Sequence, residues 1–131
     1  MGAMSGMRQA RILVVDDVAA WRKQIRSLLK AHPEWTVVGE ASDGKEAIQK
    51  ATALGPDIIL LDVGMPALNG IEAAKVIRQT CPKSRILFVT QDGDRDIRDE
   101  AMRAGALGYV LKTNAAQELV NVISTALNHD E

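Results

Sequence analysis

The sequence is poor in aromatic residues and has no excess of either charge. Only 3% of its 131 residues are aromatic, and 16 Lys and Arg face 17 Asp and Glu, which gives a net charge of −1. A protein that binds nucleic acid directly usually carries a basic excess, so this balance argues against direct DNA binding. The core must be mainly aliphatic, because 47% of the residues are hydrophobic and so few of these are aromatic.

Cysteine, long apolar runs and a leader peptide are also scarce or absent. The single cysteine, Cys81, excludes an internal disulfide and fits a reducing compartment. No apolar run approaches the roughly 18 residues that a membrane span needs. The start of the chain, MGAMSGM, has no apolar segment of the kind found in secretory signals. We interpret residues 1–8 as a disordered vector-derived remnant and expect one domain over residues 9–131.

What the sequence does contain is a strict alternation of short apolar runs and helical patterns. The runs predict strands at residues 11–16, 36–41, 57–62, 85–90 and 108–112. The helical stripe at Trp21, Ile25, Leu28 and Leu29 predicts a helix with Trp21 in the core. Four further stripes follow the later strands. This order predicts a parallel sheet with helices on both faces, and the more mixed strand at 36–41 suits an edge.

Polar side chains end several of the predicted strands. Asp16 and Asp17 end the first, Asp62 the third, Thr90 the fourth and Lys112 the fifth. The carboxyl ends of parallel strands meet at one edge of the sheet, where ligands bind in such folds. Three carboxylates there would repel, since a pair of unit charges at about 4 Å costs roughly 4 kcal/mol at an effective dielectric of 20. Oxygen-only ligands favour Mg²⁺, or Mn²⁺ in its place.

The same strand ends carry the other parts of a phosphoryl-transfer site. Asp62 is a candidate nucleophile beside the cation, Lys112 supplies positive charge for phosphoryl oxygens, and Thr90 supplies a hydroxyl donor. A strand tip fixes Asp62 rigidly while leaving its oxygens available. The sequence therefore predicts a site for an aspartyl phosphate.

Four motifs together resemble the response-regulator receiver domain. They are VVDD at 14–17, LLDVGMPALNG at 60–70, FVT at 88–90 and GYVLK at 108–112. The resemblance covers about residues 9 to 128 and implies a receiver domain over residues 9–131. It also implies the flavodoxin-like (βα)5 fold, with its five-stranded parallel sheet in the order 2-1-3-4-5. The segments at 64–78 and 105–123 resemble the LuxR/NarL-type branch.

The resemblance implies specific roles for the site residues. Asp62 would be the phospho-acceptor, with Asp17 as a direct Mg²⁺ ligand, Asp16 acting largely through a water, and the Gly64 carbonyl completing the metal site. In the second half of the chain, Lys112 would pair with the phosphoryl group. Thr90 and Tyr109 would form the switch pair that reorients on phosphorylation.

Three positions depart from the usual receiver pattern. Gln91 follows the switch threonine, where the family usually has a small residue, and Gly64 replaces a larger side chain. Both positions are expected to govern access to the phosphate. Thr113 stands where many members have proline, which bears on the geometry of Lys112.

By this resemblance the chain is a phosphorylation-activated signalling domain of a two-component system in the cytoplasm. It would take its phosphoryl group from a sensor histidine kinase and control an output such as transcription. It would not be an enzyme beyond catalysing its own phosphoryl transfer and dephosphorylation. DNA contact is expected only through an output domain that this sequence does not include. Apolar residues beyond one stripe of the last helix, Val120 and Leu127 among them, predict a phosphorylation-dependent homodimer.

Competing hypotheses belong to other classes of protein. A receiver-like interaction module would work without phosphorylation, with Gln91 obstructing the site. A small phosphatase with an aspartyl-phosphate intermediate would need a second acid two residues after the nucleophile, and Gly64 occupies that position.

Overall fold

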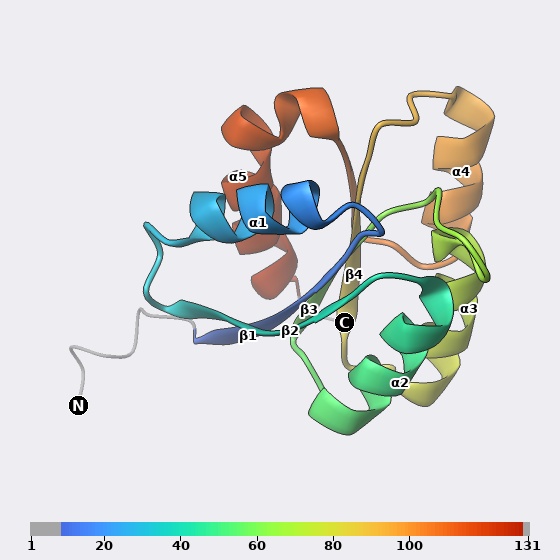
Figure 1. Ribbon diagram of the computed structural model, residues 1–131, viewed down its shortest axis with the longest axis horizontal. Helices are drawn as coiled ribbons and strands as arrows, with labels where there is room; N and C mark the ends of the chain where they lie inside the picture. The colour runs from blue at the N-terminus through green and yellow to red at the C-terminus, as the bar shows by residue number, and fades with distance from the viewer. Residues whose placement is uncertain (1–8, 130–131) are drawn as a thin grey trace.

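The computed structural model describes residues 9–129, which form alternating strands and helices (Figure 1). The strands are β1 (Ala10–Val15), β2 (Trp35–Ala41), β3 (Ile58–Leu61), β4 (Arg85–Thr90) and β5 (Gly108–Leu111). The helices are α1 (Ala19–Leu29), α2 (Gly44–Leu54), α3 (Gly70–Thr80), α4 (Arg95–Arg103) and α5 (Ala115–Leu127), with a 3₁₀ turn at Lys112–Asn114 before α5. Residues 1–8, which the sequence predicts to be a vector-derived remnant, lie outside the residues that the structure describes.

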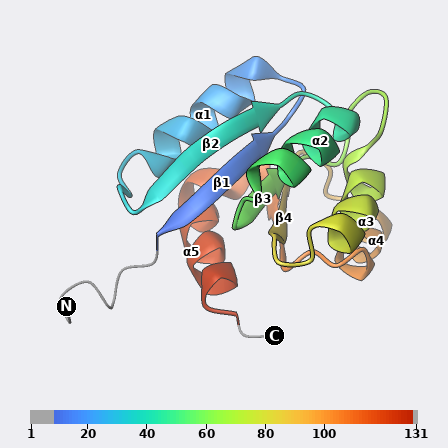
Figure 2. The ribbon, with the colours of Figure 1, turned by 90° about the horizontal axis from the view of Figure 1, so that it is seen from below.

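The strands form one parallel sheet in the order β2-β1-β3-β4-β5, which confirms the predicted flavodoxin-like topology. Figure 2 shows the arrowheads of β1 and β2 pointing the same way. β2 is an edge strand, as its mixed sequence predicts. Because every pairing is parallel, the carboxyl ends of all five strands lie at the same edge of the sheet.

Helices cover both faces of the sheet, with α1 and α5 on one side and α2, α3 and α4 on the other (Figures 1 and 2). Alternate residues of the central strands belong to different cores, because successive side chains of a strand point to opposite faces. Ile59 and Phe88 pack with α2, α3 and α4, whereas Ile58 and Leu60 pack with α1 and α5. This double burial explains why the central strands read as unbroken apolar runs.

The helix ends adjoining the site are fixed by side-chain caps. The Asn69 side chain accepts a hydrogen bond from the Glu72 N–H at 2.9 Å, which caps α3 directly after the loop from β3. The Asp94 carboxylate accepts hydrogen bonds from the N–H groups of Asp96 and Ile97 at the start of α4. These caps determine where the loops at the carboxyl edge of the sheet end.

Helix α5 uses its apolar width mainly for the core. Leu119 and Ile123 have no exposed surface, and Leu127 is also buried. Val120 and Val122 are half-buried and pack against the same core. The feature that predicts a homodimer is therefore mostly covered by the sheet, and dimerisation stays a prediction.

Candidate functional site

The register of the sheet places Asp16 beside Asp62. β1 and β3 are paired with Val15 opposite Leu61, so the next residue of each strand path falls at the same level. The Asp16 N–H donates to the Ala41 carbonyl at 3.0 Å, and the Asp62 N–H donates to the Val15 carbonyl at 3.1 Å. Both acids lie one residue beyond their strands, not within them as the predicted bounds have it, and they remain bonded to the sheet edge.

Three acids gather at this edge. The cluster consists of one carboxylate oxygen from each of Asp16, Asp17 and Asp62, and these three oxygens lie within 4.8 Å of one another. Asp16 is 1% exposed and Asp62 5% exposed, whereas Asp17 faces solvent. The structure thus brings together the three acids that the strand-end pattern selects, with one of them open to an incoming ligand.

Lys112 completes the cluster from the position directly after β5, one residue beyond the strand, although the predicted bounds 108–112 include it. Its Nζ lies 2.8 Å from Oδ2 of Asp16 and 3.5 Å from Oδ2 of Asp62, and its side chain is 2% exposed. Oδ1 of Asp16 accepts a hydrogen bond from the Val18 N–H at 2.9 Å. Oδ2 of Asp16 is buried and, within residues 9–129, has no hydrogen bond of good geometry, despite the nearby ammonium. This oxygen is thus paired with the ammonium through charge alone, and a divalent cation could share it.

The buried Asp62 carboxyl is harder to ionise than a free one. Burial is the largest cause that raises its pKa above the ordinary 3.8, and the charge of Asp16 raises the pKa further. The Thr90 hydroxyl and Lys112 act in the opposite direction by favouring the ionised form. A cation at the three acids would add to these favourable contacts and help keep Asp62 ionised.

The donor set fits a hard divalent cation. Carboxylate oxygens, one of them beside the Lys112 ammonium and one solvent-facing, are ligands suited to Mg²⁺, which keeps several of its waters when bound. The Gly64 residue is exposed, so its backbone lies at the open side of the loop after β3. The predicted magnesium site therefore matches the chemistry of the residues present.

Thr90 and Tyr109 hold the same residue of the loop between β4 and α4. The Thr90 hydroxyl, in a residue that is 2% exposed, accepts a hydrogen bond from the Asp92 N–H at 3.3 Å. The Tyr109 hydroxyl donates to the Asp92 carbonyl at 2.6 Å. Burial, followed by the charge of Asp92, raises the pKa of Tyr109 above 10.0, so its hydroxyl stays protonated as a donor. The two predicted switch residues are thus joined through one peptide segment.

The two predicted access positions are both exposed. Gln91 follows the buried Thr90 directly in sequence and faces solvent. A side chain built at Gly64 would have open space around it, since no atom of the described residues lies within 4 Å of its ideal Cβ. Both positions are therefore open to solvent in this conformation.

The prediction that Trp21 belongs to the core is wrong. Trp21 is only half-buried, and the centroid of its ring lies 5.0 Å from Nζ of Lys112. It lies one turn before the buried Ile25, in the part of α1 nearest the carboxyl edge of the sheet. The helical spacing identifies the correct face of α1, but it does not show that the core ends before Trp21.

Two further residues support the site without carrying chemistry, and neither role was predicted from the sequence. The Arg22 guanidinium donates to the backbone carbonyl of Asp16 at 2.6 Å and to Glu40 at 2.8 Å, which ties α1 to the acidic loop. Gly70 packs against the Asp62 backbone so closely that a Cβ there would lie 1.9 Å from the Asp62 carbonyl oxygen. A glycine eight residues after a site acid, at a helix start, is the one signal that pointed to the second contact.

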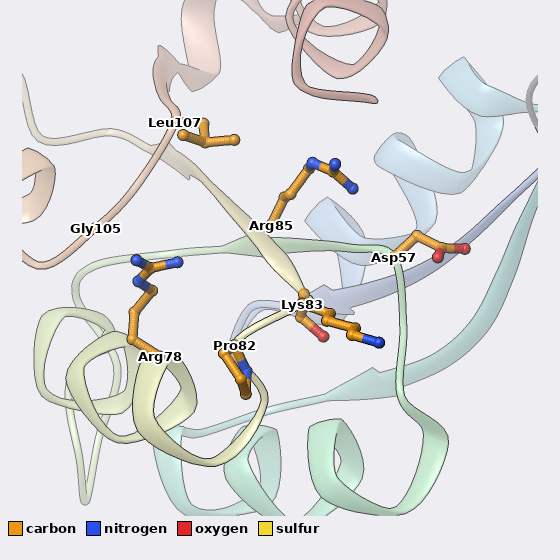
Figure 3. Close-up of a pocket in the computed structure, with 8 residues that line it drawn as sticks. Asp57, Arg78, Pro82, Lys83, Arg85, Gly105 and Leu107 are labelled. Carbon is orange, nitrogen blue, oxygen red and sulfur yellow. The ribbon is translucent and has the colours of Figure 1, made fainter. Parts of the chain in front are cut away.

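A cavity lies at the opposite edge of the sheet and does not form a site comparable to the acidic cluster. It measures about 310 Å³ and is lined by Arg78, Lys83, Arg85 and Asp57, with uncharged neighbours. Figure 3 shows the three basic side chains pointing in different directions. The Asp57 carboxylate already accepts a hydrogen bond from the Arg11 N–H at 2.8 Å. The charged groups therefore do not converge on one ligand as those at the carboxyl edge do.

The sheet order and the acidic cluster at its carboxyl edge define a doubly wound α/β domain of the receiver class. The family model of the response regulator receiver domain matches residues 12–124. This chain belongs to the response regulator receiver family, as the sequence motifs predict.

Its relatives include transcriptional regulators of the predicted branch. Transcriptional regulatory protein LiaR of Bacillus subtilis (strain 168) is 40% identical over 116 residues, which are 88% of this chain and 55% of that protein. Nitrate/nitrite response regulator protein NarL of Escherichia coli (strain K12) is 36% identical over 123 residues, which are 94% of this chain and 57% of that protein. The chain therefore spans about half the length of these relatives.

Solved structures give the same result. The response regulator domain of Thermotoga maritima CheB has a TM-score of 0.87 and 37% identity, over 95% of this chain and 100% of that chain. A two-component response regulator of the LuxR family from Aurantimonas sp. SI85-9A1 has a TM-score of 0.86 and 39% identity, over 91% and 85% of the two chains. Across residues 9–129, no helix has the length and apolar character needed to span a membrane.

Proposed function

We propose that this receiver domain accepts a phosphoryl group on Asp62 from a phosphohistidine of a sensor histidine kinase. The observation that carries the proposal is the position of the Asp62 carboxylate. It is held at a strand end, has two further acids within 4.8 Å, and lies 3.5 Å from the Lys112 ammonium. An acid that is merely solvated and has no chemical role would not need these neighbours.

The residues that would hold Mg²⁺, or Mn²⁺, are Asp16, Asp17, Asp62 and the backbone carbonyl of Gly64. When bound, the cation would supply positive charge against the acids and the phosphoryl oxygens. Asp17 is the exposed member of the acids and would be the direct ligand, while the recessed Asp16 would act largely through a water. Oδ2 of the recessed Asp16 lies 2.8 Å from the Lys112 ammonium, which supports an indirect role for this acid.

The transfer itself makes one bond and breaks one. An ionised oxygen of Asp62 attacks phosphorus, the new O–P bond forms, and the N–P bond of the phosphohistidine breaks with its electron pair leaving on the imidazole nitrogen. Lys112 stabilises the charge on the phosphoryl oxygens, and the Thr90 hydroxyl donates a hydrogen bond to one of them. Hydrolysis by water later returns Asp62 to a carboxylate and releases inorganic phosphate.

The switch would run through Asp92. In this structure the Thr90 hydroxyl accepts from the Asp92 N–H. A hydroxyl drawn toward a phosphoryl oxygen would give up that contact, and the loop held by Tyr109 would then repack. Thr90 and Tyr109 would thereby convert phosphorylation into a change at the start of α4.

The domain would act as a signalling component and not as an enzyme with a separate substrate. Its partners would be a sensor histidine kinase and an output domain that regulates transcription, in a cytoplasmic two-component system. LiaR and NarL, which are named as regulators, support this choice of output. A phosphorylation-dependent homodimer is part of the same proposal.

Intact-mass spectrometry after incubation with acetyl phosphate and Mg²⁺ tests the proposal. The wild type should gain one base-labile phosphoryl group, in a reaction that requires the cation, and Asp62→Asn should gain none. Asp99→Asn, which changes an exposed acid of α4, serves as the matched control and should label like the wild type. Equal labelling of Asp62→Asn would show that another residue is the acceptor. A wild type that gains nothing would favour the phosphorylation-independent interaction module.

A further inference from the structure

Lys112 has a third close neighbour besides the two carboxylates. Its Nζ lies 5.0 Å from the centroid of the Trp21 ring, which is within the range of a cation–π contact. The ring comes from α1, whereas the carboxylates of Asp16 and Asp62 follow β1 and β3. The ammonium is 2% exposed, so this contact operates where water screens it poorly.

The position of Trp21 lets it reach the site from the helix side. Ile25 and Leu29, on the same stripe of α1, are buried in the core, while Trp21 is half-buried and borders a shallow cavity of about 190 Å³ with Ala20 and Gln24. The next residue, Arg22, donates to the Asp16 carbonyl and fixes this turn of α1 against β1. The indole is thus held beside Lys112 by the packing around it.

We propose that Trp21 is a positioning residue that holds the Lys112 ammonium next to Asp62 during phosphoryl transfer. The inference rests on the proposed function and adds a residue that acts through Lys112. The carboxylate contacts of Lys112 change during the reaction, because a cation would share the acids and phosphorylation would remove the free carboxylate of Asp62. The attraction of the ring depends on neither event, so it persists through both.

Two substitutions at Trp21 separate the effect of the aromatic ring from the effect of side-chain size. Trp21→Leu keeps an apolar side chain without the ring, and Trp21→Phe keeps an aromatic face with a weaker quadrupole. With acetyl phosphate and Mg²⁺, Trp21→Leu should label about 3- to 10-fold more slowly than the wild type, and Trp21→Phe should lose less than about twofold. Mg²⁺ affinity, measured by calorimetry, should change less than about twofold in both, since the acids are untouched.

Trp35→Phe is the matched control. Trp35 lies at the start of β2, at the opposite edge of the sheet, where its ring stacks on His32 with centroids 4.7 Å apart. The same Trp-to-Phe change there should leave the labelling rate unchanged. If Trp21→Leu and Trp21→Phe slow labelling equally, or neither slows it, the positioning role is wrong even though Asp62 is phosphorylated. If wild-type Asp62 takes no label, the proposed function fails first.

NMR of the lysine side chains tests whether Lys112 lies against the ring, which a purely structural role of Trp21 would not require. Protons on the Lys112 ε-carbon should show an upfield ring-current shift in the wild type and in Trp21→Phe, and lose it in Trp21→Leu. The shift should persist when Mg²⁺ and beryllofluoride, a mimic of the acyl phosphate, are added. A shift that disappears on their addition would show that Lys112 leaves the ring in the phosphorylated state and would overturn the inference.

Discussion

The Lys112 ammonium lies closer to Asp16 than to Asp62, at 2.8 Å from Oδ2 of the first and 3.5 Å from Oδ2 of the second. Lys112 therefore neutralises a proposed metal ligand as well as contacting the proposed acceptor. The ammonium and a cation that reaches Asp16 through a water would compete for the negative charge of this acid. Metal binding should thus push Lys112 away from Asp16 and leave it to the phosphoryl group.

Lys112→Ala is expected to bind Mg²⁺ about 3- to 10-fold more tightly, because the substitution removes a positive charge next to the ligands. The same variant should lose the conformational response to phosphorylation. Calorimetric titration of Mg²⁺ measures the first effect. Lys83→Ala removes an exposed lysine at the opposite edge of the sheet and should leave the affinity unchanged. Weaker binding by Lys112→Ala would mean that Lys112 helps to hold the acids and does not compete with the cation.

Asp62→Asn is expected to stabilise the fold at neutral pH in the absence of metal. Burial raises the pKa of Asp62 in the folded protein above the ordinary 3.8, so the ionised carboxylate costs stability. That cost is fully present above the folded-state pKa, shrinks as the pH falls through it, and is absent below the unfolded value. At pH 7 the Tm of Asp62→Asn should exceed that of the wild type by about 2–5 °C.

The pH dependence provides the check on this cause. Thermal unfolding of both proteins from pH 7 downward should show the difference in Tm narrowing in the acid range, as the wild-type carboxyl takes up its proton. Asp99→Asn, in which the acid is exposed, should show no such difference. A gain in Tm for Asp62→Asn that is constant down to pH 4 would assign the effect to packing and not to charge.

The fold was predictable because strand and helix patterns alternate without interruption. Parallel strands align their carboxyl ends, so reading the residues at those ends selects Asp16, Asp62 and Lys112 before any coordinates are known. The register then adds what the pattern cannot: Val15 pairs with Leu61, which places the two acids side by side.

Trp21 and Gly70 show where prediction from the sequence ends. Helical spacing assigns Trp21 to the apolar face of α1, but whether that face meets core or site depends on where α1 crosses the sheet edge. Gly70 acts through contact with the Asp62 backbone eight residues earlier, a spacing that does not show how closely the two segments approach. Both depend on how the elements pack, and the local pattern does not give that geometry.

Gly70→Ala is expected to destabilise the fold by about 2–3 kcal/mol and to slow labelling of Asp62. The added Cβ would lie 1.9 Å from the Asp62 carbonyl oxygen, so either α3 or the acidic loop must move. Gly64→Ala is the matched control, since no atom of residues 9–129 lies within 4 Å of the added Cβ and the backbone carbonyl is retained. Urea unfolding compares the two variants. Equal stability would mean that the loop yields without cost.

Tyr109→Phe is expected to cost about 1 kcal/mol of unfolding free energy, because it deletes the 2.6 Å hydrogen bond to the Asp92 carbonyl. The ring should stay in place, since it also packs on Phe88 with centroids 6.1 Å apart. Amide hydrogen exchange should quicken at Asp92 and Gly93 while β4 remains protected. Unchanged exchange in this loop would indicate that the Asp92 N–H contact with Thr90 suffices to hold it.

Gln91→Ala is expected to quicken both phosphorylation and dephosphorylation, by about 3- to 10-fold each. Gln91 directly follows Thr90, and its exposed side chain can lie across the path to Asp62, which is only 5% exposed. The glutamine would hinder the phosphodonor and the hydrolytic water alike, and its amide can hydrogen-bond the phosphate. Gly64 leaves open space two residues after Asp62, but the added atoms of Gln91 should dominate. Labelling and decay rates of Gln91→Ala, compared with those of Gln79→Ala on the exposed surface of α3, decide the point. Rates that stay equal or fall would show that Gln91 points away from the path of donor and water.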